Sequence, residues 1–373
     1  MKSKISEKRD MRHRRSLQIN RTVAIWAIAF GALASVAFAA PPGLPPIILD
    51  AHCDVLLRLH DRHQDIMGGE YRGRAADIPL WREGGMNAIF FSIWVDPRVY
   101  RGDGAIKRAW TLIGELNDQA TSHSDAMTTC ATVAEARRAI ANAHLAALIG
   151  IEGGIAINDD LSMIAKYRAA GVRYMTLSWR GNLPWAGSAN PNMFEPKMGL
   201  TDFGRQVVRE MNRVGMVVDL SHVSEKTFFD AIEETSHPVF VSHSDCRAIA
   251  DNPRNITDDM LRALGKNGGV CGVNFYWDFL EKSGRGSDEG GTTVTAETVV
   301  DHIDHIVKVA GIDHVGIGTD WEGMHDPPVG LENASKMPHL FEVLRRRGYS
   351  DEAMRKIAAE NFLRVLEANE NPK

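Results

Sequence analysis

The chain has 373 residues, of which 44% are hydrophobic and 24% are charged, and its formal net charge is −5. This composition is ordinary for a globular protein, and the length suffices for one barrel-sized domain or two smaller ones. Because no basic stripe offsets the acidic balance, nucleic acid is excluded as an expected partner.

The N-terminal segment has the pattern of an export signal. Eight Lys and Arg residues lie between Lys2 and Arg21, and an uncharged run of 18 residues follows from Val23 to Ala40. The run ends in the small-x-small cleavage pattern Ala37-Phe38-Ala39. We therefore expect residues 1–39 to be a signal peptide and the mature protein to be exported to the periplasm or the cell envelope. The alternative is an uncleaved membrane anchor, since a span needs ~20 residues.

Strand-like and helix-like segments alternate along the rest of the chain. Eight segments have the pattern of buried strands: Ile47–Asp50, Ala88–Trp94, Ala146–Ile151, Tyr174–Ser178, Met216–Leu220, Val239–Ser242, Gly269–Asn274 and His314–Gly318. Amphipathic stretches such as Thr201–Val214 and Ala296–Ala310 lie between them. Eight repeats of strand and helix predict an α/β fold, a single (β/α)8 TIM-like barrel over residues 40–373. A doubly wound sheet is the alternative, but no glycine-rich phosphate turn follows the first strand.

Five of these strands stop at side chains that bind divalent metals. The side chains are His52, Asp54, Glu152, His222, His243 and Asp320. A barrel of this type gathers the carboxyl ends of all its strands at one mouth, so we expect the six to meet there. A barrel without a metal would require all five motifs to be coincidental.

The type and spacing of these residues indicate the role of each in the predicted metal site. His52 and Asp54 project to the same side of a strand, so one ion can take both. Glu152 precedes two glycines, which leave its carboxylate unobstructed, and its two oxygens can bridge two cations. His222 and His243 are natural zinc ligands that complete the shell of a second ion. Asp320 is then free to accept a proton from water and pass it to a leaving amine.

Together these motifs closely resemble the membrane dipeptidase (renal dipeptidase, M19) family of binuclear zinc peptidases. The resemblance spans nearly the whole mature chain and includes Arg254-Asn255-Ile256, Val273-Asn274-Phe275-Tyr276 and Asn361-Phe362-Leu363-Arg364-Val365. It implies a metallo-dependent hydrolase barrel with two Zn²⁺ ions per chain. His52 and Asp54 would bind one ion, His222 and His243 the other, with Glu152 bridging both and Asp320 as the acid/base.

The resemblance also implies where a substrate would bind. Arg254 matches the arginine that holds the terminal carboxylate, and Tyr276 lies in a matching segment. One departure is Trp179, which stands where the family usually has a histidine for the scissile carbonyl or the oxyanion. Indole donates one hydrogen bond but cannot become cationic, so oxyanion help would come from zinc alone or from Arg180. Family members often form dimers, so a homodimer is a further expectation.

The predicted function is that of a zinc-dependent dipeptidase that cleaves the peptide bond of dipeptides, including those with a D-residue at the C-terminal position, by a metal-bridging hydroxide. One alternative is another binuclear amidohydrolase on the same barrel, such as a deaminase, lactonase or amidase. Those enzymes commonly begin with an HxH motif, whereas this chain has HxD at His52 and Asp54. The other alternative is a zinc-containing binding protein without catalysis, which Trp179 suggests.

The remaining polar side chains predict less. The four cysteines are too scattered for a disulfide framework, so buried free thiols are favoured over a bridge between Cys246 and Cys271. His302 and His305 lie on what reads as a polar helix face and are expected to be structural or solvated. We expect 283–293 to be a surface loop and His325 to line the pocket.

Overall fold

The structure is a computed structural model that describes residues 43–68, 74–192, 195–281 and 294–370. The expected signal segment 1–39 and the expected loop 283–293 lie outside these ranges. Within the described ranges, none of the helices combines the length and the apolar character that a membrane span requires.

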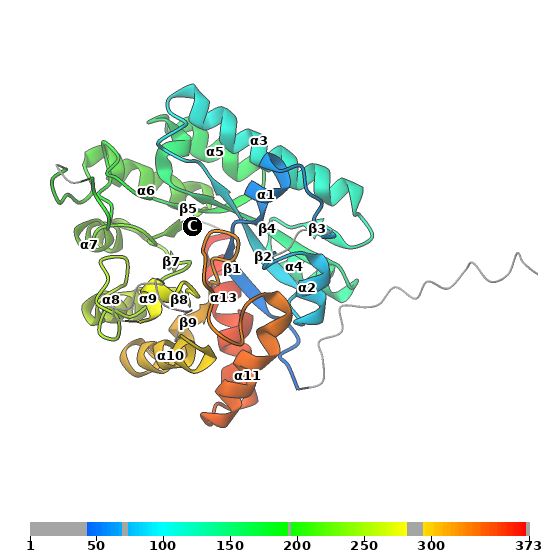
Figure 1. Cartoon of the computed structure of the whole chain (residues 1–373). Helices are drawn as coiled ribbons and strands as arrows, with labels where there is room; N and C mark the ends of the chain where they lie inside the picture. The colour runs from blue at the N-terminus through cyan, green and yellow to red at the C-terminus, as the bar shows by residue number, and fades with distance from the viewer. Residues whose placement is uncertain (1–42, 69–73, 193–194, 282–293, 371–373) are drawn as a thin grey trace, which may run out of the picture. The chain divides into compact units, whose positions relative to one another are not determined.

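Parallel strands form the centre of the fold, and eight of them follow one another around a barrel in the order β1-β2-β4-β5-β6-β7-β8-β9 (Figure 1). Their bounds, with those of the short β3 that pairs only with β4, are β1 Leu49–Cys53, β2 Ala88–Trp94, β3 Met127–Thr129, β4 Leu145–Glu152, β5 Val172–Thr176, β6 Val217–Asp219, β7 Phe240–Val241, β8 Val270–Val273 and β9 Val315–Ile317. The eight predicted strands are confirmed with small shifts at their ends, and β3 was not predicted.

The first and last strands meet just beyond their regular portions and bring the sheet close to full closure. A parallel bridge joins Cys53 to Trp321, and the backbone N–H of Asp54 donates to the carbonyl of Trp321 at 2.9 Å. The backbone N–H of Asp320 donates to the carbonyl of His52 at 3.1 Å. The predicted (β/α)8 barrel is therefore confirmed, and the bonds that close it run through three of the six candidate metal-site residues.

Helices surround the strands on the outside of the barrel (Figure 1). They are α1 Val55–Asp61, α2 Ile78–Glu83, α3 Asp103–Ser122, α4 Val133–Ala141, α5 Ser162–Ala169, α6 Asp202–Val214, α7 Glu225–Glu234, α8 Asp258–Asn267, α9 Trp277–Leu280, α10 Ala296–Ala310, α11 Met337–Arg346, α12 Asp351–Arg355 and α13 Asn361–Glu370. Five of the described helices begin after hydroxyl caps, in which a side chain accepts a hydrogen bond from the backbone N–H three residues later: Thr132, Thr201, Ser224, Thr257 and Ser350. The sequence therefore marks the starts of these helices locally.

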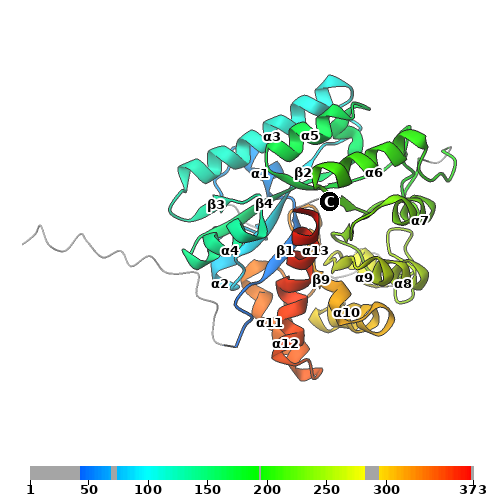
Figure 2. The same ribbon diagram turned by 180° about the vertical axis from the view of Figure 1, so that it is seen from behind.

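Two apolar cores hold this arrangement together. One lies inside the barrel, where alternate strand residues such as Phe90 and Phe240 pack against α13 through Phe362. The other lies between the strands and the surrounding helices. Figure 2 shows α13 crossing the barrel on the side opposite to the view of Figure 1. Because Arg364 donates to the carbonyls of Gly268 and Asp313, just before β8 and β9, α13 covers the amino ends of the strands and leaves the carboxyl ends free.

The four cysteines and His302 lie in the interior of the protein. All four cysteines are free and buried, as predicted, so Cys246 and Cys271 form no bridge. The expected polar position of His302 is wrong, because its ring is fully buried. His302 accepts from the backbone N–H of Cys246 and bonds to the carbonyl of Leu280, which ties α10 to the loop after β7 and to the end of α9.

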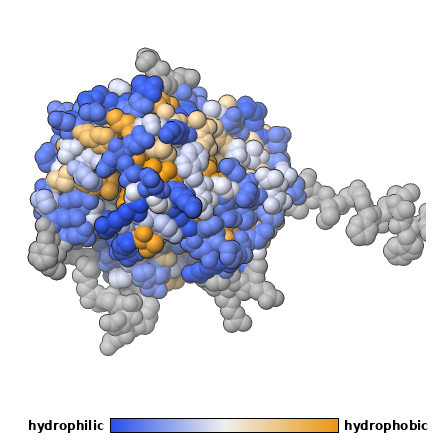
Figure 3. Space-filling model, turned by 90° about the horizontal axis from the view of Figure 1, so that it is seen from above, coloured by the Kyte–Doolittle hydropathy of each residue, from blue (hydrophilic) through white to orange (hydrophobic). Residues whose placement is uncertain are grey.

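The face drawn in Figure 3 is mostly hydrophilic, with hydrophobic residues in small patches between polar ones. In the described ranges, the large apolar side chains that are exposed are Val99, Trp110, Phe229 and Val329, which lie on four different segments. Scattered exposed apolar residues are normal for a folded chain and identify no partner surface. The expected homodimer therefore stays a prediction.

Candidate active site

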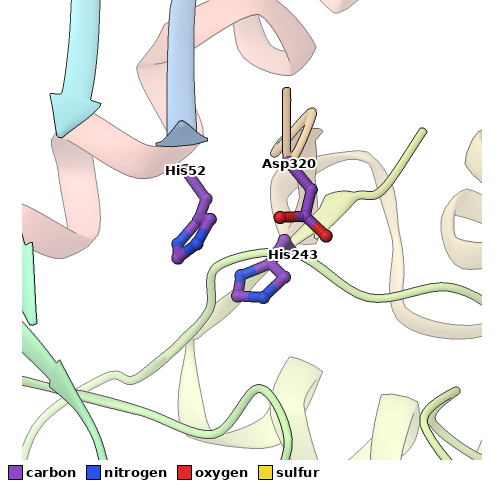
Figure 4. A group of neighbouring side chains, drawn as sticks. All are labelled: His52, His243 and Asp320. Carbon is purple, nitrogen blue, oxygen red and sulfur yellow. The ribbon is translucent and has the colours of Figure 1, made fainter. Parts of the chain in front are cut away.

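The six candidate metal-site residues come together at the carboxyl ends of the strands. His52, Asp54 and Glu152 lie at or just after β1 and β4, His222 and His243 follow β6 and β7, and Asp320 follows β9. Figure 4 shows His52, His243 and Asp320 projecting toward one another from these strand ends. Their donor atoms form three overlapping groups, each within 4.8 Å: His52 with Asp54 and Glu152, Glu152 with His222 and His243, and His52 with His243 and Asp320.

Glu152 stands at the centre of this cluster. Its Oε2 lies 3.4 Å from His52 Nε2, and its Oε1 lies 2.9 Å from His222 Nε2 and 3.6 Å from His243 Nε2. The two oxygens thus face two different sets of ligand atoms. Burial raises the pKa of the Glu152 carboxyl, but the three imidazoles, led by His52, hold it well below its usual range. Glu152 is therefore anionic and placed between two candidate ion positions.

The two histidines on the far side of Glu152 are kept neutral. Burial, reinforced by the charge of Arg254, lowers the pKa of His222 to about 3. Burial also lowers the pKa of His243 well below its ordinary value, with the charge of His52 as the next cause. Neutral imidazole is the form that binds zinc, so both rings are in the protonation state that a metal ligand requires.

The backbone around the site adopts conformations that bring side chains close together. His222 and Asp320 have φ angles of 65° and 63°, which are uncommon for residues other than glycine and cost energy that the surrounding structure must offset. Gly153, directly after Glu152, has φ 100°, a conformation that glycine adopts without strain. A Cβ atom added to Gly323 would lie 2.0 Å from Asp54 Oδ2 and 2.7 Å from Asp320 Oδ1, so only glycine fits against these carboxylates.

Asp320 differs from the other carboxylates in its partners. Its Oδ2 accepts a hydrogen bond from Asn274 Nδ2 at 3.0 Å. Burial, with the neighbouring charge of Asp54, raises the pKa of Asp320 to about 8. Cations bound beside it would lower that pKa again. A carboxyl whose pKa lies near neutrality is suited to proton transfer.

The cluster fits divalent metal ions on chemical grounds. Two buried polar atoms that point into it, His52 Nε2 and Asp54 Oδ1, have no hydrogen-bond partner. The Nε2 atoms of His222 and His243 lie 2.9 Å apart, although two neutral imidazoles can share only one proton there. Unpaired buried polar atoms are costly, and a cation beside His52 and Asp54 would satisfy both of these atoms, while a second cation could take the lone pairs of His222 Nε2 and His243 Nε2. The mixed imidazole and carboxylate set suits zinc.

A cavity of about 310 Å³ opens above these residues. This volume lies near the low end of the range of about 300–1,000 Å³ that is typical of ligand pockets. The lining includes four of the candidate metal-site residues, and its walls are formed by Leu57, Trp94, Arg98, Trp179, Arg180, Tyr276, Phe279, Glu322, Gly323, Met324 and His325. The predicted pocket position of His325 is confirmed. A small polar molecule in this cavity would therefore contact the cluster.

Two tryptophans and two arginines form one wall of the cavity. The rings of Trp94 and Trp179 meet edge to face, with centroids 5.0 Å apart. The guanidinium groups of Arg98 and Arg180 lie 5.9 and 5.3 Å from the ring of Trp179. Arg98 is neutralised by Asp96, whereas Arg180 has no carboxylate partner in the part of the chain that the structure describes. Arg180 is therefore an available cation at the rim.

Arg254 lies behind the cavity rather than in its lining. Its guanidinium donates to the carbonyl of His243 at 2.7 Å and to Ser244 Oγ at 3.3 Å, and it lies 5.5 Å from the ring of Phe279. Phe279 itself lines the cavity. The charge of Arg254 is close enough to favour the ionised forms of Asp320 and Glu152, but direct contact between Arg254 and a substrate stays a prediction.

Several residues of the site were not predicted from the sequence. Trp94 and Asn274 stand at the carboxyl ends of predicted strands, but the pattern of metal-binding side chains at those ends did not include them because they are neither His, Asp nor Glu. Arg98 lies in a loop and carried no pattern that distinguishes it from other surface arginines.

Comparison with known proteins agrees with this geometry. The family model described as membrane dipeptidase (Peptidase family M19) matches residues 45–373. An uncharacterized dipeptidase of Schizosaccharomyces pombe is 40% identical over 231 residues, which is 61% of this chain and 54% of that protein. Dipeptidase 3 of Macaca fascicularis is 33% identical over 326 residues, which is 86% of this chain and 64% of that protein. The chain thus spans between about half and two thirds of the length of these relatives.

Among solved structures, a metallo peptidase of Rhodobacter sphaeroides superposes with a TM-score of 0.77 at 29% identity. The match covers 87% of this chain and 99% of that one, which was crystallised with a phosphinate mimic of the dipeptide L-Ala-D-Ala. An amidohydrolase of Pseudomonas aeruginosa gives a TM-score of 0.73 at 25% identity. Because the family model matches most of its length, this chain belongs to the membrane dipeptidase family, Peptidase family M19.

Proposed function

We propose that this protein is a dipeptidase that holds two Zn²⁺ ions and hydrolyses the peptide bond of dipeptides. The proposal is carried by one observation: three imidazoles and one carboxylate converge on Glu152 beneath a cavity of about 310 Å³. These side chains are His52, His222, His243 and Asp54. The family of the chain supports a dipeptide substrate. The ligand of the Rhodobacter sphaeroides enzyme, a mimic of L-Ala-D-Ala, supports a D-residue at the C-terminal position.

The ligand assignment follows the two overlapping groups that share Glu152. His52 and Asp54 would hold one ion, His222 and His243 would hold the other, and Glu152 would contribute one oxygen to each. Bound divalent ions would lower the pKa of a water molecule toward neutrality and polarise the carbonyl of the peptide bond.

The protein's own residues would carry out the remaining steps. Asp320, oriented by Asn274, would accept a proton and deliver it to the nitrogen of the leaving amine. The same carboxylate would hold the ammonium group of the substrate. Arg180 at the rim, and Arg254 behind Phe279, would favour the carboxylate at the other end of the dipeptide. Fixing both ends orients the scissile bond over the ions, which lowers the entropic part of the barrier.

The position of Trp179 is a specific test of oxyanion stabilisation. Trp179→His should restore a ring that can be cationic, and kcat/KM should rise for at least one dipeptide, by up to ~10²-fold, the usual effect of one oxyanion donor. Steady-state kinetics over a dipeptide panel would measure this. Trp179→Phe is the matched control, since it removes the indole N–H without supplying an imidazole. Kinetics unchanged from wild type in Trp179→His would place the residue outside the path of the oxyanion.

Two other functions make different predictions. A different amidohydrolase on the same barrel would turn over a lactone, an amide or an amino-substituted ring but no dipeptide. The HxD motif and the carboxylate bridge at Glu152 favour the dipeptidase over that alternative. A zinc-containing binding protein would keep its metal at full occupancy and hydrolyse no substrate of either kind.

The deciding experiment combines metal analysis with a dipeptide panel on the purified protein. The panel should include dipeptides with L- and D-configured C-terminal residues, together with N-acetylated and C-amidated forms that lack one terminal charge. We expect about two zinc ions per chain and release of free amino acids from unblocked dipeptides only. Turnover of none of the dipeptides by a zinc-loaded protein would contradict the proposal. Export to the periplasm or cell envelope is a separate proposal, which N-terminal sequencing of the mature protein would test.

A further inference from the structure

Each of the two fully buried histidines of the site has a hydroxyl group on the side that faces away from Glu152. The rings of His52 and His243 offer Nε2 to the Glu152 carboxylate, and Nδ1 of each lies 2.8 Å from a hydroxyl oxygen. An imidazole that binds a metal through Nε2 must carry a proton on Nδ1, and that proton needs an acceptor. The partners of Nδ1 therefore decide whether a ring is prepared for a metal ion.

The chain of bonds behind His243 has a definite direction. Nδ1 of His243 lies 2.8 Å from Ser242 Oγ, and Ser242 Oγ lies 2.8 Å from Asp219 Oδ2. A carboxylate can only accept, so the single hydroxyl proton of Ser242 points to Asp219. A lone pair of Ser242 Oγ is then left for His243, whose Nδ1 must be the donor. Ser221 Oγ also lies near Ser242 Oγ, but at 3.2 Å, and it is a weaker acceptor than a carboxylate.

Asp219 is held in place as the end of this chain. It is fully buried at the end of β6, and it accepts hydrogen bonds from Thr176 Oγ1 at 2.5 Å and from the backbone N–H of Ser242 at 2.7 Å. Burial raises the pKa of the Asp219 carboxyl, and the donors from Thr176 and Ser242 oppose this effect. The donors come from β5 and from the residue after β7, so Asp219 joins three neighbouring segments of the barrel.

The partner of His52 is a tyrosine in the interior of the barrel. Tyr174 Oη lies 2.8 Å from His52 Nδ1 and 3.2 Å from the carbonyl oxygen of Ala51. A carbonyl can only accept, so a phenolic proton that is donated to Ala51 leaves the oxygen of Tyr174 to accept from His52 Nδ1, and this arrangement satisfies all three groups. The barrel leaves space for this ring at Gly150, where an added Cβ atom would lie 2.0 Å from Tyr174 Cζ. A phenylalanine would fill the same space but would give His52 no acceptor.

His222 differs from His52 and His243 in the partners of its two ring nitrogens. Its Nε2 lies 2.9 Å from Glu152 Oε1 and 2.9 Å from His243 Nε2, and both are acceptors if His243 carries its proton on Nδ1. His222 Nδ1 has no hydrogen-bond partner within the ranges that the structure describes. The metal-free protein therefore keeps the proton of His222 on Nε2, and zinc must displace it.

We infer that Asp219, Ser242 and Tyr174 are positioning residues that fix the rings of His52 and His243 with Nε2 directed at the metal site, while His222 changes tautomer when the ion binds. This inference rests on the metal site of the proposed function. These three residues are buried and would affect the metal site only through the two histidine rings, without contact to the ions or the substrate. We call these two hydrogen-bond chains relays. The relay of Tyr174 supports the ion that His52 would bind, and the relay of Ser242 and Asp219 supports the ion that His243 would bind.

Zinc affinity of the full chain tests the two relays separately. Tyr174→Phe and Ser242→Ala should each weaken one of the two zinc-binding steps by 10–100-fold, the usual effect of losing such a partner, and leave the other step nearly unchanged. A competition titration with a chelator would measure both steps. Tyr167→Phe is the matched control, because this buried tyrosine donates to the carbonyl of Ala156 at 2.7 Å, outside the metal cluster. Its zinc affinity should equal that of wild type, although its metal-free melting temperature should fall about as much as that of Tyr174→Phe.

Nitrogen NMR of ¹⁵N-histidine protein gives a readout that does not depend on activity. We expect His52 and His243 to be protonated on Nδ1 both with and without zinc, and the proton of His222 to move from Nε2 to Nδ1 when zinc is added. In Ser242→Ala, metal-free His243 should become a mixture of tautomers. Protonation of His243 on Nε2 in the metal-free wild type would overturn the inference.

The outcomes separate this inference from the proposed function. Wild-type zinc affinity in both variants would overturn the inference and leave the dipeptidase proposal intact. If both variants bind zinc more weakly and the wild-type protein hydrolyses no dipeptide, the inference is supported and the proposed function is contradicted. A wild-type chain that binds no zinc would overturn both.

Discussion

Glu152→Ala should release the metal ions and abolish turnover. Glu152 is the only side chain of the described residues that belongs to both the His52–Asp54 group and the His222–His243 group, so its loss removes a ligand from both ions at once. It also leaves three imidazoles without their shared anion. We expect zinc to fall from about two ions per chain to well below one, measured by elemental analysis after dialysis. Hydrolysis of dipeptides should fall to background.

The control for this variant is a second carboxylate of the same cavity. Glu322 accepts from the backbone N–H groups of Ala75 and Ala76 and pairs with Arg58, so its role is to hold loops together. Glu322→Gln keeps the acceptor oxygen and should keep both zinc ions. Circular dichroism would verify that both variants are folded. Full zinc occupancy in Glu152→Ala would show that the two ligand groups do not share an ion-bridging carboxylate.

Asp320→Asn should keep the zinc ions and lose turnover. The amide has the shape of the carboxylate but cannot accept a proton, so kcat should fall by about 10²–10⁴-fold, the typical contribution of a general acid or base. KM should change less. Because Asp320 also lies within reach of His52 and His243, zinc content distinguishes a proton-transfer role from a ligand role. Loss of zinc together with activity would mean that Asp320 binds an ion.

Asp326→Asn is the matched control for this loop. Asp326 is exposed, lies outside the lining of the cavity and has φ 53°, a conformation that asparagine tolerates as well as aspartate. Its kinetics and zinc content should equal those of wild type. A comparable loss of kcat in Asp326→Asn would mean that disturbance of the loop, rather than the missing carboxylate at Asp320, explains the effect.

The sequence predicted the barrel because its strands are buried on both faces. Ala146–Ile151 is a continuous apolar run and Ala88–Trp94 is interrupted only by Ser92, which is the pattern of parallel strands covered by helices. β3 was missed because it has three residues and ends in two exposed threonines, Thr128 and Thr129. A segment this short has no periodicity to read.

The candidate metal cluster was predictable because topology alone brings strand ends together. The hydrogen-bond partners and the packing around these ligands could not be predicted from the sequence. The acceptor that Tyr174 offers to His52 depends on the space left at Gly150, which is a property of packing rather than of spacing in the sequence. Likewise, Arg254 matched a motif, but only the fold places its guanidinium over the ring of Phe279, which lines the cavity. Long-range packing decides such details, and no local pattern records them.

Barrel closure is the event on which this account depends, because it brings His52, Asp54 and Asp320 into one cluster with residues from β4, β6 and β7. Anomalous X-ray scattering at the zinc absorption edge, from crystals of the full chain grown with zinc, tests it most directly. We expect two peaks at the carboxyl ends of the strands on either side of Glu152, one beside His52 and Asp54 and the other beside His222 and His243. No peak at this mouth, or zinc bound only on other faces of the protein, would contradict it.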